Sequence, residues 1–445
     1  MRHLLLFWAV LGLAACAALP VPSTQPSATP AALVPTLNTT PDIDPTEAPP
    51  TTQPVTPTSD AQTVPTGGEI LALSGGDLVG ISVADQSRRT ILSGVSDFMA
   101  APDGQRIAAI RGLGSAGELW SVNRDGTAAK QHTDDQRSLA GIVWLPDNSG
   151  IVYAASATDS TDRYSADRSS WLAWAAFCRQ STIIKRVWDD PREIPMGEGC
   201  DPAVSPDGKR IAYATRPTRS DTSAADPGET AGNTIHLINV AGQNGWDPVS
   251  ATGAEPGQPG QGLVVYGPVW SRDSRQLMVS VFIGNRVETD INLLTLVDAS
   301  TAAQQLLGTS AGWNRAVTPS PDGSTYVLTA QNTGNARGSM GWDTWQTMVM
   351  DFVGTREMYL PAGTYTATGN PIGETLVRGQ FAAWQPDGQA LAVVLPPDWD
   401  PSIAPNEDYG RVDEPGELWL WPVGGIPSAQ TSAPIDAGSP IQWLP

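Results

Sequence analysis

Residues 204–214 read Val204-Ser205-Pro206-Asp207-Gly208-Lys209-Arg210-Ile211-Ala212-Tyr213-Ala214, in which a short turn phrase separates two strand-like segments. Proline presets φ, aspartate can hydrogen-bond its own backbone, and glycine accepts a positive φ, so this phrase predicts a chain reversal between two β-strands. Turn chemistry therefore explains the aspartate without a catalytic role. Close relatives of the phrase recur along the chain: Pro102-Asp103-Gly104, Pro146-Asp147-Asn148, Arg272-Asp273-Ser274, Pro321-Asp322-Gly323 and Pro386-Asp387-Gly388.

The spacing of these phrases predicts the architecture. Successive turn aspartates are 44 to 66 residues apart. A propeller blade of four short strands takes about 40 to 50 residues, so each interval accommodates one blade with loops of varying length. Two positions before the turn phrase, tryptophan recurs at Trp144, Trp270 and Trp384. We expect these side chains on the innermost strands, packed between blades.

A further half-repeat lies at residues 441–445, where Trp443 and Pro445 reproduce the start of the phrase. Its missing strands are predicted at residues 69–73, 77–83 and 89–92, which precede the first turn phrase. The sequence therefore predicts an all-β fold: a seven-bladed β-propeller of four-stranded antiparallel blades, closed by pairing of the N- and C-terminal strands. A propeller of six or eight blades is the alternative.

The repeat pattern resembles that of the TolB-like propellers, a WD-repeat-like family. The Trp-Ser-Pro-Asp-Gly phrase of that family is matched most closely by residues 204–208 and 384–388. The resemblance extends over residues 68 to 445 as a repeat pattern. It implies the fold rather than a function, because propellers host many unrelated functions.

The first 66 residues predict where the protein works. A basic start precedes an apolar run at residues 4–13, which is too short for a bilayer span of about 20 residues. We interpret residues 1–15 as a signal peptide, and Leu13-Ala14-Ala15-Cys16 resembles the bacterial lipobox, in which the cysteine is lipidated. Cleavage after Ala17, which would release a soluble secreted protein, is the alternative.

Residues 17–66 are dominated by proline, threonine, serine and alanine and contain neither lysine nor arginine. Such a composition cannot bury a core, so we expect residues 16–66 to be a lipidated cysteine followed by a disordered tether. The propeller domain is predicted at residues 67–445. The protein would then be exported and anchored to the outer side of the cytoplasmic membrane or to the outer membrane.

The remaining cysteines, Cys178 and Cys200, form an even pair in an oxidising compartment and are predicted to be disulfide-bonded. Cys178 lies in a predicted loop between the second and third strands of a blade, and Cys200 lies in a connection between blades. Both kinds of segment emerge on one face of a propeller. Two unpaired thiols are the alternative.

The formal net charge of −20 argues against a nucleic-acid partner, because an acidic surface repels phosphate backbones. There is no basic amphipathic helix for a lipid surface, so the lipid anchor is the expected membrane contact. We expect a monomer.

Long predicted loops all connect second and third strands and should crown one face: residues 155–180, 215–233, 331–345 and 396–416. Trp171, Trp174 and Phe177 occur at helical spacing behind Ser169 and Ser170, which are plausible caps. They would either pack on the propeller or form a ligand anchor. Trp399 and Tyr409 are further candidate ligand-binding residues.

No catalytic or metal motif is convincing. Gly308-Thr309-Ser310-Ala311-Gly312 matches a nucleophile motif but joins two predicted blades, and His132 and His236 are the histidines left as bases after the signal. His236 falls within a predicted strand. Six crown carboxylates lack calcium-loop spacing and are read as a solvated acidic loop: Asp398, Asp400, Glu407, Asp408, Asp413 and Glu414.

The sequence therefore favours a noncatalytic module that binds an envelope protein, peptide or glycan on the crowned face, without cofactor or metal. The alternative is an extracytoplasmic glycan hydrolase or lyase that uses crown carboxylates as acid and base.

Overall fold

The computed structural model describes residues 67–112, 116–134, 137–156, 171–217, 232–251, 263–285, 290–311, 313–333, 343–352, 355–360, 363–372, 376–377, 379–400 and 415–445. The chain divides into two compact units, residues 1–59 and 60–445. All described residues belong to the second unit. The signal peptide, Cys16 and the tether lie outside them and stay predictions.

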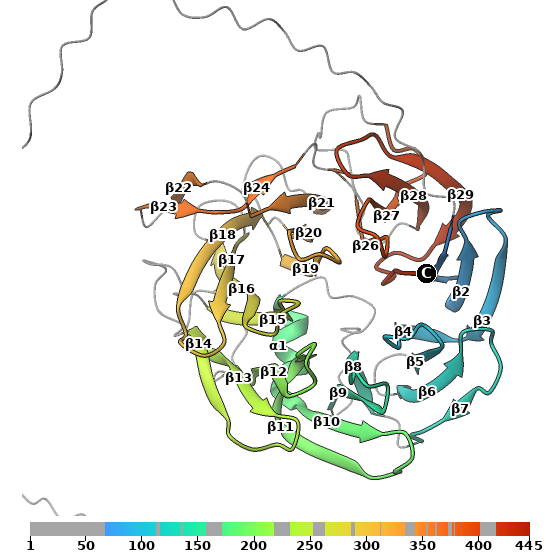
Figure 1. The fold of residues 1–445 in the computed structure, drawn as a ribbon, viewed down its shortest axis with the longest axis horizontal. Coiled ribbons are helices and arrows are strands. Elements are labelled where there is room, and N and C mark those ends of the chain that lie inside the picture. Colours follow the sequence, from blue (N-terminus) through green and yellow to red (C-terminus); the bar gives the residue numbers. More distant parts are fainter. Residues whose placement is uncertain are drawn as a thin grey trace, which may run out of the picture. The chain divides into compact units, whose positions relative to one another are not determined.

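Antiparallel sheets follow one another around a common centre, as expected for a β-propeller (Figure 1). The first sheet has the order β3-β2-β1-β30 and joins strands from both ends of the described chain. Its strands are β1 (Glu69–Ser74), β2 (Asp77–Ser82), β3 (Arg88–Ser93) and β30 (Gln442–Leu444). The second sheet contains β4 (Val95–Ala100), β5 (Arg106–Arg111), β6 (Glu118–Asn123) and β7 (Lys130–Gln131).

The next sheet has seven strands because one long strand serves two neighbouring units. Its strands are β8 (Ser138–Trp144), β9 (Gly150–Ser156), β10 (Ser181–Val187), β11 (Glu193–Val204), β12 (Arg210–Thr215), β13 (Asn233–Asn239) and β14 (Trp246–Ala251). The start of β11 pairs with β10 and its end pairs with β12. Cys200, which the sequence analysis placed in a connection between blades, therefore lies inside a strand.

Three further groups complete the described strands. One contains β15 (Val264–Trp270), β16 (Gln276–Asn285), β17 (Asp290–Asp298) and β18 (Gln304–Ala311). The next contains β19 (Trp313–Pro319), β20 (Thr325–Thr333), β21 (Asp343–Asp351), β24 (Asn370–Pro371) and β25 (Leu376–Val377), with a hairpin of β22 (Arg356–Leu360) and β23 (Gly363–Ala367). The last contains β26 (Ala382–Trp384), β27 (Ala390–Leu395), β28 (Gly416–Pro422) and β29 (Ser428–Ile435).

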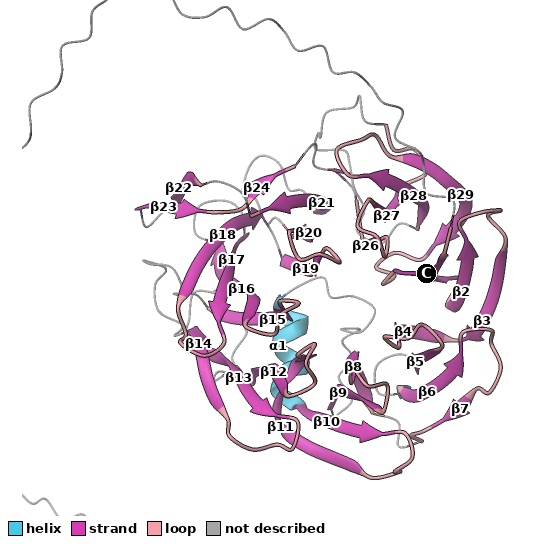
Figure 2. Cartoon of the chain, viewed as in Figure 1, coloured by secondary structure: helices cyan, strands magenta, loops and turns pink. Residues whose placement is uncertain are grey.

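One helix interrupts the strands among the described residues, α1 (Trp171–Gln180), between β9 and β10 (Figure 2). It lies where the spacing of Trp171, Trp174 and Phe177 predicts a helix. The fold is therefore nearly all-β, with antiparallel sheets of mostly four strands.

The turn phrases form the predicted reversals. In each of the six, the aspartate Oδ1 accepts the N–H of the residue two positions later, at 2.9 to 3.1 Å. The third residue of the phrase has a positive φ, which Asn148 (60°) and Ser274 (61°) adopt in place of glycine. These aspartates are structural residues of the turns.

The recurring tryptophans connect neighbouring sheets. The Nε1 atoms of Trp144, Trp270 and Trp384 donate to main-chain oxygens of the preceding innermost strand at 2.8, 3.1 and 2.9 Å, respectively. The guanidinium of Arg210 lies 4.7 Å from the centre of the Trp270 ring, a cation–π contact. The predicted packing of these tryptophans between blades is confirmed.

The two ends of the described chain meet in the first sheet. β30 pairs with β1 in antiparallel register, with Ile70 opposite Trp443. The Asp436 carboxylate accepts the N–H groups of Gly75 and Gly76 at 2.6 and 2.7 Å, and the Ser439 hydroxyl accepts the N–H of Leu73 at 2.8 Å. The C-terminal segment is thus hydrogen-bonded to β1 and to the turn that follows it.

Candidate functional site

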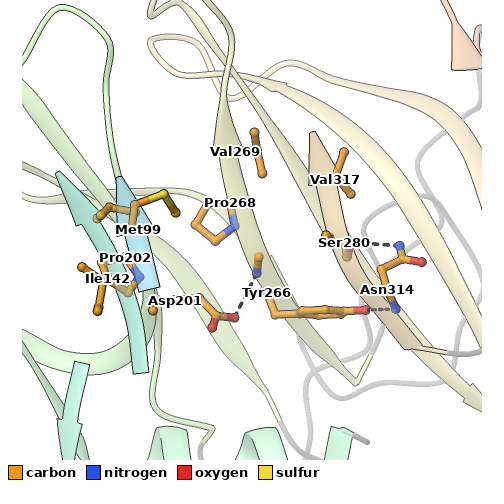
Figure 3. Close-up of a pocket in the computed structure, with 14 residues that line it drawn as sticks. Met99, Ile142, Asp201, Pro202, Tyr266, Pro268, Val269, Ser280, Asn314 and Val317 are labelled. Atoms are coloured by element: carbon orange, nitrogen blue, oxygen red, sulfur yellow. Dashed lines mark hydrogen bonds between the residues drawn. The ribbon is translucent and has the colours of Figure 1, made fainter. Parts of the chain in front are cut away.

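The innermost strands surround a cavity of about 260 Å³, which we call the axial cavity (Figure 3). Its wall is built from β4, β8, β11, β15, β16 and β19, which belong to consecutive sheets. The polar side chains that line it are Asp201, Tyr266, Ser280 and Asn314.

Bulges shape this wall. The ladder register shifts at Gly141 in β8, at Asp201 in β11 and at Gly267 in β15. Each of the three residues lies five positions before the turn phrase of its repeat and has a positive φ, of 68°, 50° and 57°, respectively. Aspartate tolerates this conformation better than most residues with a side chain. The bulge therefore places a carboxylate at a position where two other repeats have glycine.

The Asp201 carboxylate connects three parts of the structure. Its Oδ2 accepts the indole Nε1–H of Trp174 at 2.7 Å and the main-chain N–H of Gly267 at 3.2 Å. The first bond links Asp201 to α1, and the second links it to β15. Asp201 thereby anchors the inserted helix to the wall of the axial cavity.

A second polar group lies beside Asp201, on β15 and the strands next to it (Figure 3). The Tyr266 hydroxyl donates to Asn292 Oδ1 at 2.9 Å and accepts the main-chain N–H of Asn314 at 2.8 Å. The Asn314 Nδ2 donates to Ser280 Oγ at 2.9 Å. Because Asn292, Asn314 and Ser280 are buried, these bonds hold the side chains in fixed orientations.

On the side of the axial cavity that is nearer the turn phrases, the lining residues are apolar. A neighbouring cavity of about 380 Å³ shares Met99, Val143, Pro202, Pro268 and Val269 with the axial cavity. It adds residues closer to the turns, Trp144 and Trp270 among them, and no charged residue lines it among the described residues. The polar groups of the axial cavity therefore lie away from the turn phrases. They lie on the side from which the connections between second and third strands emerge.

The disulfide predicted from the sequence is present. Cys178 and Cys200 are bonded, with a Cα–Cα distance of 4.9 Å. The bond joins α1 to β11 one residue before Asp201. It reinforces the same junction that the Trp174–Asp201 hydrogen bond makes.

Trp174 and Phe177 do not form a surface anchor. Both side chains are buried, Trp174 completely, in a core that includes residues of β12 and β15. The Trp174 ring also lies 5.7 Å from that of Tyr266. The packing alternative is therefore correct for these two residues, because three-residue spacing turns both toward the sheets beneath the helix. The side chain of Trp171 lies outside the described residues.

The other predicted ligand-binding residues are distant from this wall or not described. Trp399 packs edge-on against Trp419, with ring centres 5.3 Å apart, at the edge of the core next to β27 and β28. Tyr409 and the carboxylates of residues 407–414 lie outside the described residues, whereas Asp398 and Asp400 are exposed. No group of metal-ligating side chains is present in the described part of the chain.

The two histidines have structural partners. His236 lies on β13, as expected, with its Nδ1 2.5 Å from Asp247 Oδ1. His132 Nε2 is 2.7 Å from Ser121 Oγ. Burial, together with the positive charges of Arg186 and Lys130, lowers the pKa of His132 from 6.5 to about 4. The segment 308–311 of the nucleophile-like motif lies on strand β18, not on a strand-to-helix turn.

Sequence reasoning missed Asp201, Tyr266 and Asn314. A signal for Asp201 was present, since aligning the turn phrases places it at the position of Gly141 and Gly267. Tyr266 and Asn314 carried no comparable signal. Their role depends on a hydrogen bond between residues 48 positions apart in the chain.

No protein-family model matches the chain, and no curated protein matches its sequence. Among the described residues, no helix is long and apolar enough to cross a membrane.

Solved structures similar to this chain include a functionally unknown protein from Desulfotomaculum acetoxidans, with 13% identity and a TM-score of 0.51, covering 85% of this chain and 99% of that one. TolB from Acinetobacter baumannii is 13% identical with a TM-score of 0.41, covering 85% of this chain and 82% of that one. The Cps50 (Swd1) β-propeller domain of Myceliophteria thermophila is 12% identical with a TM-score of 0.46, covering 79% and 91%.

At sequence identities of 12–13%, similarity to these structures concerns the fold and not the function. TolB proteins and a WD-repeat-type propeller stand among the structures similar to this chain, as the repeat pattern of the sequence predicted. The strand topology, together with the similarity to the Desulfotomaculum acetoxidans protein, identifies the described unit as a β-propeller in fold.

Proposed function

We propose that this protein is a noncatalytic binding module whose ligand, a protein segment, peptide or glycan, enters the axial cavity from the face that carries the long loops. The observation that carries the proposal is the arrangement of Asp201, Tyr266 and Asn314, which belong to three neighbouring sheets and line the axial cavity beside an apolar region. Concave sites with a few fixed polar groups and apolar walls are typical of ligand pockets.

The proposal includes a closed seven-bladed propeller. Pairing of β1 with β30 supports closure, because it makes strands from the two ends of the described chain neighbours in one sheet. The shared strand β11 supports a count of seven, because each half of the seven-stranded sheet has the four strands of one blade.

We further propose that Cys16 is lipidated and that residues 17–66 tether the propeller outside the cytoplasmic membrane. The lipobox-like sequence supports the anchor. The Cys178–Cys200 disulfide supports an oxidising, extracytoplasmic compartment. Cys16→Ala should abolish retention in the detergent phase, and equal partitioning of variant and wild type would contradict the anchor.

The binding proposal is tested by filling the axial cavity. Ala316 lines the cavity, so Ala316→Trp should block it, whereas Ile426→Trp changes a side chain that is 77% exposed in the turn between β28 and β29. In pull-downs from envelope extracts, Ala316→Trp should lower capture of a specific partner at least about tenfold, the effect of losing about 1.4 kcal/mol. Ile426→Trp should not.

The same preparations should be screened for hydrolysis or lyase activity on cell-wall glycans and peptides. Turnover by the wild type would favour the glycan-processing alternative. Unchanged capture by a folded Ala316→Trp variant would contradict the axial cavity as the binding site.

A further inference from the structure

The four polar side chains that line the axial cavity differ in exposure. Tyr266, Ser280 and Asn314 are 3%, 2% and 4% exposed, and hydrogen bonds connect them to one another and to Asn292. Asp201 is partly exposed. A group that enters the cavity therefore reaches the Asp201 carboxylate more readily than the other three side chains.

Asp201 supplies the charge of this wall. Among the described residues, no other charged residue lines the axial cavity, and none lines the neighbouring cavity. The hydrogen bonds that Asp201 Oδ2 accepts from Trp174 and Gly267 come from neutral N–H groups. These two bonds orient the carboxylate without cancelling its charge, and a carboxylate has about four acceptor sites in all. The described lining of the two cavities is therefore negative at one point and otherwise uncharged.

Prolines reduce the number of hydrogen-bond donors beside this carboxylate. The register shifts place Asp201 with Pro202, and Gly267 with Pro268, outside the regular pairing of their strands. Both prolines line the axial cavity, and proline has no main-chain N–H. A ligand group that donates hydrogen bonds therefore suits this part of the wall better than one that accepts them.

Open space adjoins the bond between Asp201 and Gly267 (Figure 3). A Cβ atom added to Gly267 would have no heavy atom of the described residues within 4 Å. At Gly141, the equivalent bulge residue of β8, an added Cβ would lie 3.2 Å from Pro202 Cδ. The wall at Gly267 thus has room for a small group next to the carboxylate.

We propose that the axial cavity selects a ligand with an alkylammonium group, for which Asp201 is the counter-ion. The inference rests on the proposed function, because it names the ligand chemistry of the same site. An ammonium group has three donors and no acceptor, and its hydrogen bonds to a carboxylate are stronger than neutral ones. The apolar side chains of Val143 and Val269 would contact the methylene groups. Peptide amino termini and lysine side chains carry such a group, so the inference favours a peptide or protein over a neutral glycan.

A conservative substitution separates this role of Asp201 from its structural role. Asparagine tolerates the φ of 50° at this position, and its amide oxygen can accept the same N–H groups of Trp174 and Gly267. Asp201→Asn therefore removes the charge and keeps the bonds to α1 and β15. The matched control is Asp273→Asn, which removes one charge from the turn that follows β15, where the Asp273 side chain is 60% exposed.

Ligand-observed NMR titrations of the full chain compare pentylammonium chloride with pentanol, a neutral probe of the same length. The wild type should bind pentylammonium at least about tenfold more tightly, because hydrogen bonds to charged groups contribute more than neutral ones. In Asp201→Asn this preference should disappear, with the melting temperature nearly unchanged. Asp273→Asn should keep the preference, and Ala316→Trp should bind neither probe.

Two short peptides distinguish the sources of the ammonium group. One has a free amino terminus and no lysine, and the other has an acetylated amino terminus and one lysine. Displacement of pentylammonium by the first identifies an amino terminus as the ligand group, and displacement by the second identifies a lysine side chain. Displacement by neither would overturn the inference that a peptide supplies the ammonium group.

Equal binding of the two probes by the wild type would overturn the ammonium preference, and this comparison does not require that Asp201→Asn folds. A preference that Asp201→Asn retains would overturn it too, as would pentylammonium binding that persists in Ala316→Trp. If both probes bind equally and Ala316→Trp abolishes both, the ammonium preference fails while the axial cavity stands as a binding site. Absence of binding by either probe would overturn the inference, and the capture assay with Ala316→Trp decides the proposed function independently.

Discussion

The indole Nε1 of Trp384 donates a 2.9 Å hydrogen bond to the main-chain oxygen of Thr318, across the boundary between two sheets. Trp144 and Trp270 make the same kind of bond to the sheet before theirs. A side chain defined by its distance from a turn phrase thereby sets the spacing between neighbouring blades.

Trp384→Phe should lower the free energy of unfolding by about 1–3 kcal/mol, because it leaves the Thr318 carbonyl without its donor and reduces packing. Urea unfolding measures the change. Trp246→Phe is the control, since Trp246 is 36% exposed and should change stability by less than about 0.5 kcal/mol. Equal effects of the two substitutions would contradict a special role of the inter-blade bond.

Deleting residues 439–445 should destabilise the whole propeller. The deletion removes β30 and the Ser439–Leu73 hydrogen bond, and it exposes the edge of β1. Loss of the buried Trp443 side chain alone corresponds to about 3–5 kcal/mol. A melting temperature close to that of the wild type would show that the strand is dispensable.

Opening the Cys178–Cys200 disulfide should also lower stability. The cysteines are 22 positions apart, for which the chain-entropy model gives about 3 kcal/mol. Reductant should lower the urea midpoint of the wild type but not that of a Cys178→Ala, Cys200→Ala double variant. Mass mapping without reduction should find one bridged peptide, and free thiols at both positions would contradict the pairing.

Trp174→Ala should cost about 3–5 kcal/mol, because a completely buried indole leaves a cavity. Trp174→Phe should cost less and chiefly remove the hydrogen bond to Asp201. Thermal melts run beside a capture assay separate the two roles of this residue. Lost capture with an unchanged melting temperature would restore the ligand-anchor hypothesis.

His132 should make stability depend on pH in mildly acidic solution. Its folded pKa of about 4 lies below the ordinary value of 6.5. Between these values, the unfolded chain binds a proton that the folded chain does not, so the free energy of unfolding should fall as pH falls from 6.5 to 4. Unfolding curves across this range should show a flatter dependence for His132→Phe. An identical dependence would contradict the burial of a neutral imidazole.

Much of the fold was predictable because its signals are local. A Pro-Asp-Gly turn depends on the φ preferences and hydrogen bonds of adjacent residues, and these are the same in an isolated phrase and in the folded chain. The helical spacing of Trp171, Trp174 and Phe177 is likewise a local pattern. Position within the repeat was enough to predict the inter-blade tryptophans, and the cysteine pair followed from the face that both segments share.

The tertiary structure decided which side chains face the axial cavity and which are buried. Trp174 and Asp201 are 27 positions apart, and their contact exists because α1 folds back against β11. The predicted connection between blades at Cys200 is likewise part of the continuous strand β11, since the start of β11 pairs with β10 and its end pairs with β12. The burial of Arg186, which is 6% exposed, likewise has no signal in the local sequence. Local preferences determine turns and elements, but burial and charge pairing depend on contacts between distant segments, which form only when the sheets pack together.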